Sequence, residues 1–264
     1  MEKILRNEED VIRLLDIAVE AGRILIENGD EVYRVEDTLE RICNSWDGLD
    51  AVEVFAMTTS VFITIKFKGY PYTEIIRERN PSIRLHKIEL INQFSREFCS
   101  TNMSLDEGEE EIRKINESKL TPLFIRSIGA GITSAFFSIM FGGEYLDFLS
   151  SLLIGFLVFW LLNVPKNFFI PVFIVDLLSG LLSSALATIF ISMGFGSNLD
   201  MIIIGSLMPY VPGVSITNAI RDILAGDYVS GVMTTAKAIF TAIAIALGVG
   251  IVLAIYFGGY RWNI

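Results

Sequence analysis

Residues 145–162 read YLDFLSSLLIGFLVFWLL, a continuous apolar run in which Asp147 carries the single charge. A stretch close to the ~20 apolar residues that cross a hydrocarbon core predicts a membrane-spanning helix. Other backbone conformations leave polar groups unsatisfied in lipid. Comparable stretches fill the C-terminal half, so the fold class is an α-helical integral membrane protein with about five spans. They are expected at about 122–141, 145–162, 168–193, 201–220 and 231–257.

The charge distribution divides the chain at Lys119. Residues 1–119 contain 25 Asp and Glu and 16 Lys and Arg, whereas residues 120–264 contain 6 and 5. A soluble domain is about 25% charged, and only the first half resembles one. We therefore expect an N-terminal cytoplasmic α+β domain with an acidic connector at 1–119, and a membrane domain at 120–264.

The formal net charge of −10 lies almost wholly in the first half. Nucleic acid requires a basic face, and peripheral binding to anionic lipid requires clusters of Lys and Arg, so neither is expected. The chain is expected to contact the lipid bilayer through its membrane-spanning helices instead. Cys43 and Cys99 have no metal-ligand spacing and are expected to be free thiols. No metal or cofactor is expected.

The N-terminal half begins with two predicted helices. Apolar residues recur at helical intervals over residues 11–28, and Gly29 is a natural stop. Asp30 is expected to cap a second helix that ends near Trp46. Acidic Glu36 and basic Arg34 in that helix are expected to form an ion pair, with ligand contact as the alternative.

The pattern then changes to a period of two. Residues 51–57 and 61–67 alternate as strands do, and a third extended piece follows Gly69. A helix is expected from about 85 to 98. Residues 106–119 contain DEGEEE, and a charge run of this kind predicts a solvated helix or loop.

The charges beside the spans predict the orientation. The N-terminus, MEKILRNEED, has no apolar core of a signal peptide, so no cleavage is expected. Of the positive charges near the span ends, Arg261 is expected on one side of the membrane. The others are expected on the opposite side: Lys114, Lys119, Arg126, Lys166 and Arg221. The positive-inside rule then places the N-terminal domain in the cytoplasm and the C-terminus outside.

Residues 207–231, LMPYVPGVSITNAIRDILAGDYVSG, predict a broken helix. Each proline removes a backbone donor and clashes with the preceding turn. Unwound backbone at membrane depth is tolerated where it lines a cavity, as in many secondary transporters. A simple kink, or a helix that ends at the interface, is the alternative. The candidate substrate or ion path comprises, besides Asp176 and Lys237 in other spans, these residues of the segment: Pro209, Pro212, Gly213, Thr217, Asn218, Arg221 and Asp222.

Two ionisable residues lie farther into the spans. Asp176 is expected inside the third span, where such groups are costly and usually functional. It could carry a proton, bind a cationic group or pair within the bundle. Lys237 either snorkels or pairs with Asp176. Close helix contact is predicted where small residues recur, at Gly129 and Gly131, Gly180 and Ser184, and Gly248 and Gly250.

Signals for an enzyme are weak. The one histidine, His86, has no second ligand and no nucleophile motif beside it. A Gly-rich phosphate loop followed by Lys and Ser or Thr is also missing from the sequence, which argues against ATP-driven pumping by this chain. A transporter is therefore favoured over an enzyme. A membrane-anchored sensory or regulatory subunit, whose soluble domain binds a small ligand, is the alternative.

Several motifs together resemble the threonine/serine exporter family. They are AGRILIENGDEVYRVEDTLERI, VEVFAMTTSVFITI, IRERNPSIRLHKIELINQFSR, FGGEYLDFL and PGVSITNAIRDILAGDYVSG. The resemblance covers nearly the whole chain. The positions that match family motifs are Gly29, Arg34, Glu36, Asp147, Pro212, Gly213, Asn218, Arg221, Asp222, Gly226 and Asp227.

The resemblance implies an inner-membrane exporter that uses an ion gradient to move small amino acids or related carboxylates, such as succinate, out of the cell. This chain is similar to the longer component of the split form. A short multi-span membrane partner is implied, with a homo-oligomer as the alternative. After Ser230 and Gly231 the family shows an Arg and then a Glu, whereas this chain has Thr234 and Lys237. That departure bears on the substrate or the coupling ion.

Overall fold

The computed structural model describes residues 3–78, 82, 84–119, 121–164 and 170–261, without the side chains of 259–261. Lys166 and the side chain of Arg261, used above for orientation, lie outside this description. The chain divides into two compact units. The first unit is Met1–Lys119 with Thr217–Thr234, and the second unit is Leu120–Ile216 with Thr235–Ile264.

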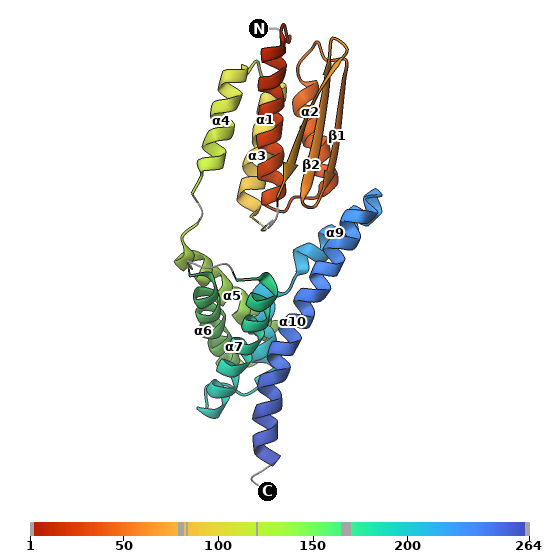
Figure 1. The fold of residues 1–264 in the computed structure, drawn as a ribbon. Coiled ribbons are helices and arrows are strands. Elements are labelled where there is room, and N and C mark those ends of the chain that lie inside the picture. Colours follow the sequence, from red (N-terminus) through yellow and green to blue (C-terminus); the bar gives the residue numbers. More distant parts are fainter. Residues whose placement is uncertain (1–2, 79–81, 83, 120, 165–169, 262–264) are drawn as a thin grey trace. The chain divides into compact units, whose positions relative to one another are not determined.

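Two helices open the first unit (Figure 1). Helix α1, Glu8–Glu27, ends as predicted at Gly29, whose φ of 76° is a conformation that favours glycine. Helix α2 is Val32–Asn44. The expected Asp30 cap is wrong, because Glu31 precedes the helix and its side chain makes no capping bond. Asp30 instead accepts a hydrogen bond from the Glu31 amide at 3.0 Å.

The predicted strands form an antiparallel sheet in the order β1-β2-β3. Its strands are β1 Ala51–Met57, β2 Ser60–Phe67 and β3 Tyr70–Arg77. Lys68 and Gly69 join β2 to β3 with φ values of 49° and 84°, as in a two-residue turn that matches strand twist. The alternation is confirmed in β2, where every second side chain is buried: Val61, Ile63, Ile65 and Phe67.

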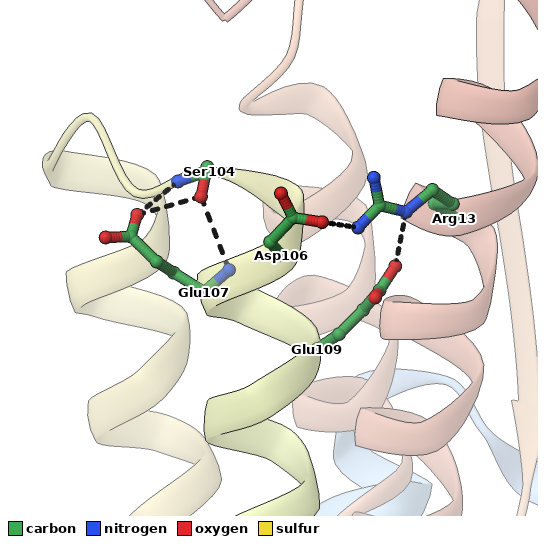
Figure 2. Close-up of polar contacts among 5 residues, drawn as sticks. All are labelled: Arg13, Ser104, Asp106, Glu107 and Glu109. Carbon is green, nitrogen blue, oxygen red and sulfur yellow. Dashed lines mark hydrogen bonds and ion pairs between the residues drawn. The ribbon is translucent and has the colours of Figure 1, made fainter.

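Helix α3, Leu85–Ser100, leads to α4, Leu105–Glu117. Ser104 and Glu107 form a capping box at the start of α4. Arg13 of α1 bonds to Asp106 and, at 2.6 Å, to Glu109 (Figure 2). The expectation of a merely solvated acidic segment is wrong for one face of α4, which buries Leu105, Gly108, Ile112 and Ile115.

Within the residues that the structure describes, four helices are long and apolar enough to cross a membrane. They are α5 Leu123–Met140, α6 Tyr145–Asn163, α7 Val172–Ser192 and α10 Tyr228–Arg261. A further pair is bent by 55°: α8 Leu199–Leu207 with the 3-10 turn η1 Met208–Tyr210, followed by α9 Gly213–Ala225. If the bent pair is one span, the described part of the chain has five spans.

Small residues allow the helices of the second unit to approach closely. A Cβ added at Gly180 would lie 2.3 Å from the Ile245 carbonyl oxygen, and one at Gly248 would lie 2.2 Å from that of Leu177. Helices α7 and α10 therefore touch backbone to backbone. Gly131 packs in the same way, whereas Gly129 and Gly250 have nothing within 4 Å.

Candidate functional site

Two motifs far apart in the sequence meet in the first unit. One is the turn between α1 and α2, and the other is the second half of α9. Asn218, Arg221 and Asp222 are three and four residues apart, so they lie on one face of α9. We call their contact with residues 29–32 the α9 docking contact.

Side chains of α9 make the first two bonds of the α9 docking contact. The Asn218 amide nitrogen donates to the Gly29 carbonyl oxygen at 3.4 Å. The Arg221 guanidinium forms an ion pair with the Glu31 carboxylate. The Glu31 side chain is 7% exposed and that of Arg221 is 54% exposed, so the acid is buried while its partner reaches solvent.

Asp222 makes the third bond. Its carboxylate accepts from the backbone amide of Val32, the first residue of α2, and the residue is 2% exposed. The first amides of a helix have no partner within the helix and favour a nearby anion. Since Glu31 gives α2 no side-chain cap, Asp222 supplies that acceptor from α9.

Glu36, near the α9 docking contact, bonds to the sheet of the first unit. Glu36 accepts from the Ala56 amide at 2.8 Å, which joins α2 to β1. The expected ion pair of Glu36 with Arg34 is wrong, because none of the ion pairs between described residues joins them. Burial raises the pKa of Glu36, and the charges of Asp227 and Glu40 raise it further.

Gly226 and Asp227 form the turn from α9 into α10. Gly226 has a φ of 102°, and its amide bonds to the Ile223 carbonyl. The Asp227 amide bonds to the Asp222 carbonyl at 2.8 Å. These two bonds are those of a Schellman motif, which ends helices on a left-handed residue.

Thr217 lies on an exposed face of α9.

The second unit holds the buried Asp176 on α7. Asp176 is 9% exposed and accepts a hydrogen bond from the Thr241 hydroxyl of α10 at 2.7 Å. The proposed pair with Lys237 is not a direct ion pair between described residues, but the charge of Lys237, which is exposed, acts on Asp176. Thr241 was missed, although it lies one helical turn beyond Lys237 on the same face.

The two prolines lie at the bend between α8 and α9. Pro209 falls within η1, and Pro212 immediately precedes α9. Val211 between them is extended, with φ −62° and ψ 129°. The predicted break is therefore present, and the helix changes direction by 55°. Gly213 begins α9 with open space where a Cβ would lie.

Asp147 forms a polar network at the start of α6. The residue is fully buried, and its carboxylate accepts from the backbone amides of Glu144, Ser197 and Asn198 at 2.8, 2.7 and 3.0 Å. The Asn198 side chain donates a fourth bond at 3.0 Å. Asp147 thereby joins α6 to the loop before α8.

Several apolar helices long enough to cross a membrane define a multi-pass membrane protein, and a proline break and a buried carboxylate are features that secondary transporters use. Residues 16–256 match the family model described as "Putative threonine/serine exporter", and the chain belongs to this family. The family is one of transporters, not of enzymes. No curated protein and no solved structure matches the chain.

Proposed function

We propose that this chain is the larger component of a secondary active exporter. It moves small amino acids such as threonine and serine, or related small carboxylates such as succinate, out of the cell with a short multi-span partner or as a homo-oligomer. The observation that carries the proposal is the family match over residues 16–256. The bend at Pro209 and Pro212 adds support, because broken helices expose backbone polar groups to substrates.

Asp176 is our candidate for the coupling ion or the substrate ammonium group. A carboxylate within a membrane helix is costly unless it has a function or a partner. The Thr241 hydroxyl occupies one oxygen of Asp176 and is a neutral partner. Lys237 acts on Asp176 through its charge but forms no direct ion pair with it among the described residues, so the carboxylate can still bind a cation or a proton.

The orientation belongs to the same proposal. We infer that the N-terminus is cytoplasmic and the C-terminus outside, in the inner membrane. Lys114, Lys119, Arg126 and Arg221 support this assignment through the positive-inside rule. Reporter fusions after Lys119 and after Ile264, one active only in the cytoplasm and one only outside, test it. Reporter activity on the same side at both positions would contradict it.

Gradient-driven efflux tests the function. Vesicles containing the chain, with and without its partner, are loaded with labelled threonine, serine or succinate. We expect efflux of at least one substrate, and a loss of about tenfold or more in Asp176→Asn. Asp200→Asn is the matched control, because Asp200 is exposed on α8 and its loss should leave efflux unchanged.

Two results would contradict these assignments. Efflux by Asp176→Asn at the parent rate would remove Asp176 from the path. Absence of gradient-dependent efflux of all three substrates, with the partner present, would favour the sensory or regulatory subunit instead.

A further inference from the structure

Helix α9 is bound on one face and open on the other. From Thr217 onward it belongs to the first unit, although it directly follows the bend at Pro212. Its bound face carries the α9 docking contact. Its other face exposes Ile216, Ile220 and Leu224, each four residues from the next. The second half of α9 is therefore held in the first unit through its polar face.

The α9 docking contact depends on buried charge. Glu31 and Asp222 are 6% and 2% exposed, so each carboxylate has left water. Removing one member of a buried pair leaves an uncompensated charge, which costs far more than loss of a surface ion pair. Arg221 is thus needed for the contact, and the Val32 amide is needed beside Asp222.

The surroundings of the α9 docking contact are acidic. Asp30 lies in the turn, Glu36 and Glu40 lie on α2, and Asp227 follows α9. Burial raises the pKa of Asp30, while the nearby charge of Arg34 acts in the opposite direction. Among the described ion pairs, Arg221 is the cation that binds Glu31. Loss of Arg221 would leave an excess of negative charge at the turn.

We propose that Glu31, Asn218, Arg221 and Asp222 are positioning residues that hold α9 at its bend, so that the first unit controls export through the α9 docking contact. This inference rests on the proposed exporter function. The chain runs from η1 into α9 and from α9 into α10 without a long linker. Release of α9 from residues 29–32 therefore frees both neighbouring membrane segments to change conformation.

Hydrogen exchange on the full chain tests the contact without reference to transport. In Arg221→Gln we expect amides of residues 29–44 and 217–226 to exchange about tenfold faster or more, since local opening becomes easier. Export should fall about tenfold in maximal rate, with KM for the transported amino acid unchanged, as expected for a residue that does not touch substrate.

A double variant separates this role from simple destabilisation. Glu31→Gln is nearly isosteric and removes the buried charge that Arg221→Gln leaves unpaired. The pair Glu31→Gln with Arg221→Gln should therefore exchange about threefold or more slower than Arg221→Gln alone and recover part of the export rate. Arg41→Gln is the matched control, because Arg41 pairs with Asp37 on the exposed side of α2.

Two outcomes would overturn the inference. One is unchanged exchange of both segments in Arg221→Gln. The other is strict additivity of the two substitutions, which would show that the residues act independently. If the parent chain exports none of the tested substrates while the exchange results hold, the proposed function fails and the α9 docking contact stands.

Discussion

The interiors of the two units of this chain differ in composition. In the first unit the largest fully buried side chains are aliphatic or aromatic, among them Phe94, Phe98 and Leu39. In the second unit the buried residues of α5 and α7 are mainly Ser, Gly and Ala. Many large apolar side chains there are exposed, Phe240 and Ile255 by 63% and 72%, although Ile154 and Ile202 belong to a buried cluster.

The difference follows from the solvent. Water drives apolar side chains of the first unit into a core. Lipid solvates such side chains as well as a protein interior does, so helices of the second unit gain from close packing and from hydrogen bonds between them. The same substitution should therefore have different effects in the two units.

Truncation of a large buried side chain should cost most in the first unit. Phe98→Ala is expected to lower the free energy of unfolding by about 3–5 kcal/mol, through lost burial and a cavity. Phe240→Ala on α10 is the matched change in the second unit and should cost less than about 1 kcal/mol, since that side chain is exposed. Denaturant titration of the full chain in detergent measures both. Equal losses would refute the comparison.

Removal of the Asp147 carboxylate should cost nearly as much. Asp147→Ala leaves three backbone amides without their acceptor, and we expect a loss of about 2–3 kcal/mol. Asp200→Ala, at an exposed position, should lower the free energy of unfolding by only about a few tenths of the loss in Asp147→Ala. Efflux per folded molecule should stay at the parent value in Asp147→Ala. A selective loss of efflux would instead indicate that Asp147 takes part in transport.

Close packing of α7 and α10 is tested by two glycines of one helix. Gly248→Val should cost about 1–3 kcal/mol, because the added atoms meet the Leu177 carbonyl. Gly250→Val, two residues farther along, has open space and should be tolerated. Thermal unfolding in detergent compares the two variants. Similar melting temperatures would show that α7 and α10 do not depend on this contact.

The smallest effect concerns a half-buried acid in the first unit. The pKa of Glu36 is higher in the folded protein than in the unfolded chain, where it is about 4.3. Ionisation of Glu36 therefore lowers the free energy of unfolding as the pH rises from the unfolded pKa through the folded pKa. Glu36→Gln should therefore gain less than about 1 kcal/mol at neutral pH and nothing below about pH 4. Thermal unfolding against pH measures this gain, with exposed Glu89→Gln as control. A gain that grows on acidification would contradict the assignment.

Local patterns in the sequence predicted the helices and strands well. The alternation of β2, the stop at Gly29 and the proline break each depend on a few neighbouring residues. The buried face of α4 was missed because its charge run concealed four well-spaced small and apolar residues. Two partners of Asp147, Ser197 and Asn198, were missed because they lie 50 and 51 residues away.

The candidate site was predicted residue by residue but not as an arrangement. Both motifs of the α9 docking contact were identified, yet their contact joins residues 190 positions apart. No helical or strand period encodes a separation of that length. Glu31 was overlooked for the same reason, although it lies inside a quoted motif between Gly29 and Arg34.

The cap that Asp222 gives to α2 has a consequence for biosynthesis. Residues 8–44 leave the ribosome first, but the acceptor for the Val32 amide and the partner of Glu31 are made 190 residues after them. At the ~5–20 residues per second of translation, that interval is roughly 10–40 s. Most of the membrane helices must therefore be synthesised before α2 of the N-terminal unit acquires the acceptor for its first amide.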